Sequence, residues 1–383
     1  MKRMVSKVMM GAAALSLMLA PAAWAENIKV GAILAVTGPA SFLGGPEART
    51  LEMLVADINA KGGMNGKQVD LIIKDSAGNP EKAVSFAKQL IEEEKVLTII
   101  GPSSSGETMQ IKKIAEDGKT PLLSCAAAEV IVDPVASYVF KTPQKDSDAV
   151  KMIYKEMNKL GLVNVAVLAD NTGFGKAGME QLEKIAPEFG IKIVEKESYD
   201  TKDSDLTAPV AKIKANKDVQ AIVNWSVAPA QSIVVKNIRQ AGWNVPIFQS
   251  HGFGNIKFVE AAGAAAEGVI FPAGRLLIAS DLPADNPQKG LLVQYKKNYE
   301  EKYKENVSTF GGHAYDAFVI LDAAVKVGGN DRDKVRAAIE GLQNLPGTAG
   351  VFSFSAKDHN GLTIDAFQMM TVKDGKFVAY SGK

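Results

Sequence analysis

Short apolar runs of strand length alternate along this sequence with segments of helical periodicity, and this alternation constrains the fold more than any other feature. Apolar runs at 28–35, 69–73 and 96–100 are each followed by a segment in which apolar residues recur every three or four positions. Continuous apolar runs are typical of strands buried on both faces, as in a parallel sheet covered by helices. The pattern therefore predicts an α/β fold with a parallel sheet and helices on both faces.

The same alternation starts again in the second half of the chain. Further strand-like runs lie at 163–168, 191–194 and 219–225, and two strands with alternating apolar residues are predicted in the tail at 351–354 and 367–372. No Pro/Ser-rich linker separates the two series, and 383 residues are enough for two domains. We therefore predict two similar α/β lobes joined by short crossovers, with 141–143 (KTP) and 271–272 (FP) as candidates.

The first 25 residues have the features of a secretory signal peptide. Lys2, Arg3 and Lys7 precede an apolar stretch of twelve residues at 8–19, and the sequence AWA at 23–25 is a typical cleavage motif. Twelve apolar residues are too few to span a membrane, which takes about 20. We therefore expect export to the periplasm, with cleavage after Ala25.

The charge balance gives no indication of a nucleic-acid partner. The 44 basic and 43 acidic residues nearly cancel, and removal of the predicted leader changes the formal charge from +1 to −2. A nucleic-acid-binding chain would carry a basic patch or stripe. The sequence therefore predicts no nucleic-acid partner.

Cysteine and histidine usage argues against a disulfide, a metal site and a catalytic centre. Cys125 is the only cysteine, and its apolar neighbours indicate a packed thiol rather than a nucleophile. His251, His313 and His359 lie far apart in the sequence and lack the spacing of metal ligands or of a hydrolase triad. We expect no metal, no cofactor and no enzymatic activity.

A serine-rich loop at 101–106 (GPSSSG) lies between a predicted strand and a predicted helix. Backbone N–H groups and hydroxyls at a helix start can hold an anion without a basic residue, and a carboxylate is the natural guest. One serine would also serve as a helix N-cap, so the run fits either an anion site or a cap. The loop lacks the lysine of a phosphate-binding loop, because Glu107 and Thr108 follow it, and its glycines are one residue too far apart for a nucleophile elbow.

The sequence GFGKAG at 173–178 matches the glycine pattern of a dinucleotide-binding loop, and Glu195 follows 22 residues after Gly173. Such a loop needs its first glycine directly at the end of the strand. Here three residues intervene, and the large Phe174 occupies the turn. We therefore expect no nicotinamide site, and we expect Phe174 to face the region between the lobes.

Aromatic residues lie just beyond several strand-like runs, where open parallel sheets bind their ligands. These residues are candidates for the wall of an apolar pocket, although each one alone is explained equally well as core. They are Phe42, Phe174, Trp225 and Phe253.

Several short motifs occur in an order and spacing that resemble one known family. They lie at 29–39 (KVGAILAVTGP), 57–63 (DINAKGG), 75–80, 100–105 (IGPSSS), 199–205 and 314–317 (AYDA). With them the mature chain resembles, end to end, the periplasmic solute-binding proteins of branched-chain amino acid (leucine/isoleucine/valine-type) ABC transporters. The resemblance implies a type I periplasmic binding protein fold, in which two Rossmann-like lobes, joined by a three-stranded hinge, close on a ligand. We expect residues 26–142 and 273–350 to form the N-terminal lobe, and residues 143–272 and 351–383 the C-terminal lobe.

The resemblance also implies the residues of a carboxylate site. Ser104 and Ser105 are both predicted to bind the ligand, and Ser105 matches the position whose hydroxyl and N–H hold the ligand carboxylate. Ala126 and Ala128 match the backbone and side-chain partners that follow, but leucine-type relatives have a threonine hydroxyl at the last position, and Ala128 has none. Phe174 falls where those relatives place a tyrosine that contacts the ligand.

The resemblance fails at the site of the ligand ammonium. Near residues 251–254 (HGFG) the relatives carry a glutamate that pairs with the ammonium, and this chain has no acid between Asn224 and Asn255. A buried ammonium without an anion costs several kcal/mol. We therefore hypothesise a ligand that keeps the carboxylate and lacks an α-amino group. The four aromatic residues would suit an aromatic or other apolar acid, and His251 could meet a ring substituent. In the alternative alignment, a loop shift brings Asp170 or Glu267 into the cleft.

The sequence therefore predicts an extracytoplasmic binding protein, with no covalent chemistry, that delivers a small carboxylate to the membrane permease of an ABC transporter. Lobe closure around the ligand would be its mechanism, and we expect a monomer. A sensor module of the same fold that feeds a receptor is the alternative. An exported dehydrogenase or hydrolase is a third possibility, which the lack of a catalytic triad and of a metal set disfavours.

Overall fold

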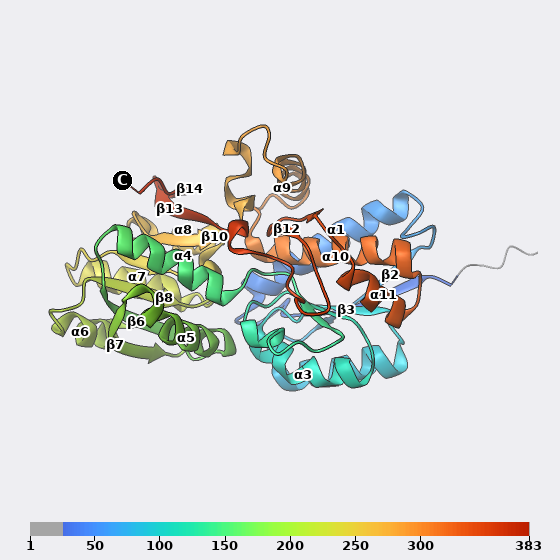
Figure 1. Cartoon of the computed structure of the whole chain (residues 1–383), viewed down its shortest axis with the longest axis horizontal. Helices are drawn as coiled ribbons and strands as arrows, with labels where there is room; N and C mark the ends of the chain where they lie inside the picture. The colour runs from blue at the N-terminus through green and yellow to red at the C-terminus, as the bar shows by residue number, and fades with distance from the viewer. Residues whose placement is uncertain (1–25, 383) are drawn as a thin grey trace, which may run out of the picture.

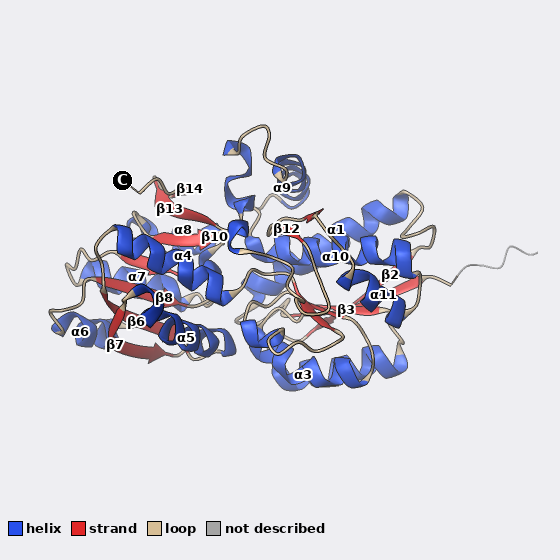
Figure 2. Cartoon of the chain, viewed as in Figure 1, coloured by secondary structure: helices blue, strands red, loops and turns tan. Residues whose placement is uncertain are grey.

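The apolar runs predicted as strands form the centres of two sheets, and each sheet lies in its own α/β lobe (Figure 1). The computed structural model describes residues 26–382, so the predicted leader, residues 1–25, lies outside the described residues. In both lobes the strands lie inside and helices cover them, as the sequence pattern predicts (Figure 2). Among the described residues, no helix is both long enough and apolar enough to cross a bilayer.

The first lobe is built on a five-stranded sheet in which all strands are parallel, in the order β2-β1-β3-β4-β5. The strands are β1 (Ile28–Leu34), β2 (Val69–Asp75), β3 (Thr98–Ile100), β4 (Leu122–Ser124) and β5 (Val139–Lys141). The helices that cover this sheet are α1 (Ser41–Ala60), α2 (Pro80–Lys88), α3 (Ser105–Asp117), α10 (Thr309–Gly328) and α11 (Arg332–Glu340). Although α10 comes from the far end of the chain, it packs along α1 and shares a core with β1 and β3.

The second lobe is built on a seven-stranded sheet in the order β14-β13-β10-β9-β8-β6-β7. Its parallel strands are β6 (Asn164–Asp170), β7 (Lys192–Tyr199), β8 (Ala221–Trp225), β9 (Ile247–Gln249) and β10 (Ile270–Ala273). Two antiparallel strands, β13 (Gln368–Lys373) and β14 (Lys376–Ala379), complete the sheet. The helices are α4 (Asp146–Lys159), α5 (Gly173–Ile185), α6 (Thr207–Ala215), α7 (Ala230–Gln240) and α8 (Ile256–Ala262), and α9 (Lys289–Tyr303) precedes α10.

The structure corrects the sequence prediction at two strands: the run predicted at 191–194 continues as far as Tyr199 in β7, and the strand predicted at 351–354 is shorter. The predicted strand 351–354 is only the two-residue β12 (Val351–Phe352), which pairs with β11 (Leu345–Pro346) rather than with the tail. Helix α1 begins at Ser41, seven residues before the apolar periodicity starts at Ala48. Its early start depends on Gly44, where any side chain would overlap with the backbone of Ala35 after β1.

The chain passes between the two lobes three times. The first crossing follows β5, as predicted for residues 141–143. The second starts only after Ala273, because Phe271 and Pro272, predicted as a crossover, lie inside β10 and pair with Met370 and Met369 of β13. The third crossing leads into β13. The sheets therefore confirm two lobes with three connections, whereas the residue boundaries of the lobes stay a prediction.

The buried ammonium of Lys141 holds the first crossing in place. Its Nζ atom donates to the carbonyl oxygens of Ala127 (2.7 Å), Pro143 (3.2 Å) and Gln144 (2.8 Å). The side chain is completely buried, and burial lowers the pKa of Lys141 to about 8 against the opposing attraction of Asp146. Because three carbonyls accept from it, the ammonium is satisfied in spite of its burial.

We predict that Lys141→Met lowers the free energy of unfolding by about 3–5 kcal/mol, since three buried carbonyls lose a donor and buried Asp146 loses its counter-charge. Urea unfolding of the mature chain measures this effect. Lys145→Met is the matched control, because Lys145 forms only a partly exposed ion pair with Asp358 (3.3 Å) and should cost at most about 1 kcal/mol. Equal losses in the two variants would contradict the role assigned to Lys141.

Candidate ligand-binding site

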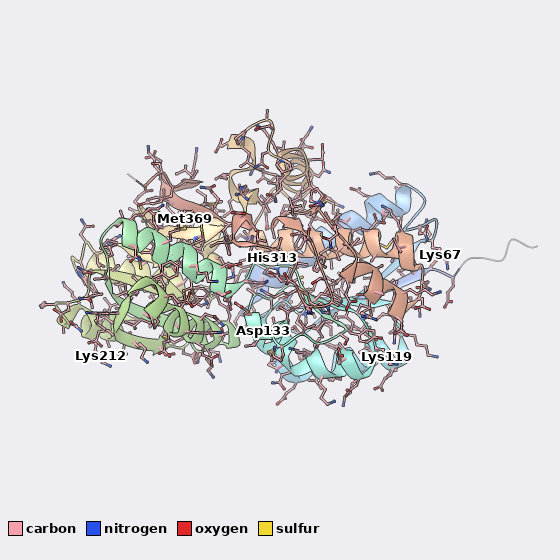
Figure 3. The ribbon with its side chains drawn as sticks, in the orientation of Figure 1. Lys67, Lys119, Asp133, Lys212, His313 and Met369 are labelled. Carbon is pink, nitrogen blue, oxygen red and sulfur yellow. The ribbon has the colours of Figure 1, made fainter. Side chains whose placement is uncertain are left out.

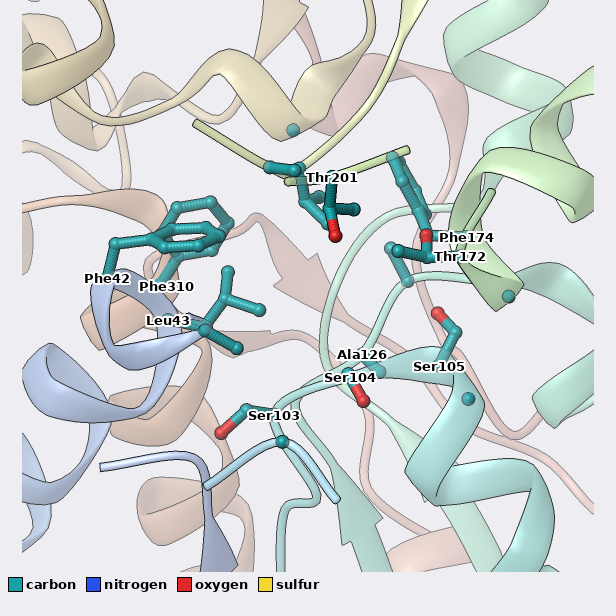
Figure 4. Close-up of a pocket in the computed structure, with 18 of the residues that line it drawn as sticks. Phe42, Leu43, Ser103, Ser104, Ser105, Ala126, Thr172, Phe174, Thr201 and Phe310 are labelled. Carbon is teal, nitrogen blue, oxygen red and sulfur yellow. The ribbon is translucent and has the colours of Figure 1, made fainter. Parts of the chain in front are cut away.

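A cavity of about 570 Å³ lies where the two lobes meet. Residues from both lobes line it, and they come mainly from loops that follow the carboxyl ends of parallel strands. Figure 4 shows Phe42, Leu43 and Phe310 on one side, the serine loop below, and Thr172, Phe174 and Thr201 opposite the serines. Apolar side chains predominate, and the lining residues of the described chain include no Asp or Glu.

The first two serines of the loop are engaged within the protein. Ser103 accepts a hydrogen bond from the amide of Ala35 (3.0 Å) and donates its hydroxyl to the buried carboxyl group of Glu47. Ser104 is the N-cap of α3, because its Oγ accepts from the amide of Glu107 (3.3 Å) and donates to the Glu107 carboxylate (2.6 Å). Ser103 therefore connects the loop to α1 by a hydrogen bond. Ser104 is the helix N-cap that the sequence offered as one of two roles for this serine run.

Ser105 differs from its two neighbours because its hydroxyl proton is not used. Its Oγ accepts from the amide of Ala128 (3.2 Å) and donates to no group in the described chain. The side chain is 3% exposed and lines the cavity at the start of α3. A buried hydroxyl that still has a proton to donate, placed at the positive end of a helix, can bind an anion.

The structure brings six of the nine predicted site residues to the cavity wall. They are Phe42, Ser104, Ser105, Ala126, Phe174 and His251. Ala128, Trp225 and Phe253 do not reach it. Ala128 uses its amide to hold Ser105, and Phe253 packs in the core against Phe258 and Phe271, with ring centroids 6.0 and 5.3 Å away. Trp225 is fully buried behind Phe174, with ring centroids 5.6 Å apart.

The cavity is also lined by residues that the sequence analysis missed. Thr172, Thr201 and Val227 directly follow or lie close behind β6, β7 and β8, so their position after a strand could have indicated them. Phe310 and His313 come from the first turns of α10, more than 130 residues after Phe174, and no local signal indicates them.

The glycine pattern at 173–178 has a packing explanation instead of a dinucleotide site. A Cβ atom at Gly175 would overlap with the Asp170 carbonyl, and one at Gly178 would overlap with the indole ring of Trp225. At Gly173, a Cβ atom would lie 3.0 Å from the amide nitrogen of Gly106. The three glycines therefore allow α5 to approach the end of β6, the indole ring and helix α3.

The two acids that an alternative alignment would bring into the cleft are both engaged elsewhere. Asp170 accepts from the Ser226 hydroxyl (2.6 Å) and from the amides of Thr172 and Val227. Glu267 accepts from the amides of Asp374 (3.0 Å) and Gly375 (2.7 Å) in the turn between β13 and β14. Neither carboxylate lines the cavity.

Two buried histidines line the cavity, and Figure 3 shows His313 near the middle of the molecule, where the lobes meet. His251 and His313 are each 6% exposed, and both ring nitrogens of His251 and Nδ1 of His313 have no hydrogen-bond partner in the described chain. Burial, and then the charge of Lys141, lowers the pKa of His251 well below its usual value and that of His313 to about 3. Both side chains are therefore neutral at physiological pH.

His251 is held in an aromatic enclosure at the junction of the lobes. Its ring meets the rings of Phe174, Trp225 and Phe367 nearly edge to face, with centroids 5.4 to 5.6 Å apart. Its Nε2 atom lies 3.5 Å from Oδ1 of buried Asp146, at the start of α4. The His251 side chain therefore lines the cavity and also lies against Asp146, which follows the first crossing, and Phe367, in the third crossing.

Comparison with known protein families identifies the architecture. Residues 27–376 match the family model described as "Periplasmic binding protein". The leucine-, isoleucine-, valine-, threonine- and alanine-binding protein of Pseudomonas aeruginosa is 27% identical to this chain over 82% of each chain.

Solved structures show the same similarity. An extracellular ligand-binding receptor from Rhodopseudomonas palustris HaA2 is 26% identical and superimposes with a TM-score of 0.87 over 93% of this chain and 100% of its own. The branched-chain amino acid transporter substrate-binding protein LivJ of Streptococcus pneumoniae, solved with isoleucine, is 27% identical, with a TM-score of 0.81 over 92% of this chain and 98% of its own. These structures confirm the type I periplasmic binding protein fold predicted from the sequence.

The buried acid beneath the serine loop predicts a dependence of stability on pH. Glu47 is completely buried, and burial raises its pKa from 4.5 to about 8 although the Ser103 hydroxyl donates to it. Between these two values the folded chain binds more protons than the unfolded chain, so the free energy of unfolding falls as the pH rises.

We predict that the free energy of unfolding of wild type falls by about 3–4 kcal/mol relative to that of Glu47→Gln between pH 5 and pH 8. Glutamine is the suitable reference because its amide is isosteric with the carboxyl group and does not titrate. Urea unfolding of both proteins across this pH range measures the difference between their free energies of unfolding. The opposing contribution of His313 is the same in both proteins and therefore cancels in this difference. A difference that stays constant with pH would show that Glu47 keeps an ordinary pKa in the fold.

Proposed function

Because the chain belongs to the periplasmic binding protein family, we propose that it is the extracytoplasmic solute-binding component of an ABC transporter and captures a small carboxylate by lobe closure. Members of this family bind ligands and do not catalyse reactions, in agreement with the expectation that the chain is not an enzyme. The ligand would pass to a membrane permease, and the two lobes would close around it during capture.

Ser105 is the observation that carries the proposal. It is nearly buried in a cavity between two lobes, lies at the N-terminus of α3, and has a hydroxyl proton with no acceptor in the described chain. Buried donors without acceptors are rare in native proteins and are normally satisfied by a ligand or by water. A ligand carboxylate would accept this proton together with the free amides of the first turn.

The walls of the cavity support an acid without an α-amino group. The lining residues of the described chain include no carboxylate, and Lys202, at the edge, is their one Lys or Arg side chain. An ammonium in the closed cavity would therefore have no anionic partner, which is costly for a buried charge. Phe42, Leu43, Phe174 and Phe310 present an apolar surface that suits an aromatic or other apolar acid. The neutral side chain of His251 suits an uncharged substituent on the aromatic ring of the ligand.

We further propose that the chain works as a monomer in the periplasm, after cleavage of residues 1–25 following Ala25. The described part contains both lobes and a complete interlobe cavity, which supports a functional single chain. The match to a family described as periplasmic supports this location.

We predict that amine-free acids, such as benzoate and cinnamate, raise the melting temperature of the mature protein, and that leucine, isoleucine and valine do not. At 1,000 times its dissociation constant a ligand adds about 4 kcal/mol, which corresponds to a shift of several degrees. The measurement is a thermal-shift screen after refolding, which removes any carried ligand. A shift with the three amino acids alone would refute the proposed ligand class.

We predict that Ser105→Ala weakens binding of such an acid by about 1–3 kcal/mol, since a charged group loses a buried donor. Isothermal titration calorimetry measures the change. Asp331→Ala is the control, because it removes the cap of α11, which does not line the cavity, and should cost about 1 kcal/mol of stability without a change in affinity. Unchanged affinity in the Ser105 variant would mean that the carboxylate binds elsewhere.

A further inference from the structure

Two helices, one from each lobe, begin at the same point of the cavity wall. Helix α3 starts at Ser105 and α5 starts at Gly173, and both first turns line the cavity. Figure 4 shows Ser105 beside Thr172 and Phe174, on the side of the cavity away from Phe42 and Phe310. A Cβ atom on Gly173 would lie 3.0 Å from the nitrogen and 3.2 Å from the Cα of Gly106, so the two helix starts lie side by side with little room for a side chain between them.

Both helix starts leave amide groups without acceptors. In α3, Ser104 accepts from the amides of Glu107 and Thr108. In α5, Thr172 accepts in the same way from the amides of Gly175 (3.2 Å) and Lys176 (3.0 Å). The remaining first-turn amides donate to no group among residues 26–382, and they belong to Ser105, Gly106, Gly173 and Phe174.

Both helix starts present a positive end to the cavity. The N-terminus of each helix acts as roughly half a positive charge, and two such ends close together repel each other. The carboxylates of Glu107 and Asp170 at these helix starts offset part of this repulsion, but neither lines the cavity. An anion between the two ends would turn this repulsion into attraction.

A second observation also points to a ligand at this place. His251 is 6% exposed and lines the same cavity; its Nε2 atom faces Oδ1 of Asp146 at 3.5 Å, and its Nδ1 atom has no partner in the described chain. Its ring lies 5.4 Å from that of Phe174, in the first turn of α5. Unsatisfied buried groups on one cavity wall are typical of a site that a ligand completes.

We propose that the ligand carboxylate is held between the N-termini of α3 and α5. The amides of Gly173 and Phe174 then form the second half of the carboxylate site, opposite Ser105. The carboxylate itself, rather than the apolar part of the ligand, draws the lobes together. This inference rests on the proposed function and extends it, because the sequence analysis assigned carboxylate binding to residues of the first lobe alone.

The test is Gly173→Ala, measured with cinnamate and with its uncharged isostere cinnamamide, or with benzoate and benzamide if cinnamate does not bind wild type. The added methyl group would push the two helix starts apart while every amide is retained. We expect roughly a ten-fold or larger loss of affinity for the acid, with little change for the amide. Gly290→Ala is the matched control, since Gly290 lies in the first turn of α9 with no atom within 4 Å of its Cβ position.

Small-angle X-ray scattering of wild type gives a second test that needs no variant. We expect the acid to reduce the radius of gyration and a saturating concentration of the amide to leave it unchanged. Equal compaction by both compounds, or equal acid affinity in the Gly173 and Gly290 variants, would overturn the inference and leave the proposed function intact. If neither acid binds wild type, the proposed function and this inference both fail.

Discussion

The buried ammonium of Lys141 is the interaction on which the geometry and the electrostatics of the cavity both depend. It binds the carbonyls of Ala127 and Pro143, which line the cavity, and that of Gln144 in the first crossing, so wall and hinge are held by one group. Its charge also helps to keep His251 and His313 neutral. Because the Lys141 ammonium binds both the first crossing and residues of the cavity wall, a movement of this crossing also displaces that part of the wall.

The architecture could be predicted from the sequence because long apolar runs that end near glycines are typical of buried parallel strands. The runs that became β1, β2, β6 and β8 are five to eight residues long. Three-residue strands such as β4, β5 and β9 are too short to show a period, and only their neighbours in the sheet define them. The start of α1 escaped prediction for a similar reason, since Gly44 serves a contact with Ala35 that no local pattern reveals.

The site could be predicted only in part, because identical residues acquire different roles from distant partners. Three consecutive serines are equivalent in the sequence, yet the first donates its hydroxyl proton to Glu47 and the second donates to Glu107. Only the third, Ser105, has a hydroxyl proton without an acceptor in the described chain. Most strand ends were predicted to within two residues, although β7 runs five residues past its predicted end at 194. The direction of each side chain could not be predicted, so Trp225 and Phe253 lie behind the wall. The contribution of α10 depends on the second crossing and has no local signal.

Electrostatics connects these features to the class of ligand. Glu47 is neutralised by burial below about pH 8, while Glu107 and Asp170 are bonded to neighbouring hydroxyls away from the wall. The cavity wall presents the N-termini of two helices, the Ser105 hydroxyl proton, the Lys202 side chain, two neutral imidazoles and several aromatic rings. Such a wall attracts an anion and offers no anionic partner to a cation. The proposed ligand, an acid without an amino group, matches such a wall, whereas the ammonium of an amino acid would lack an anionic partner there.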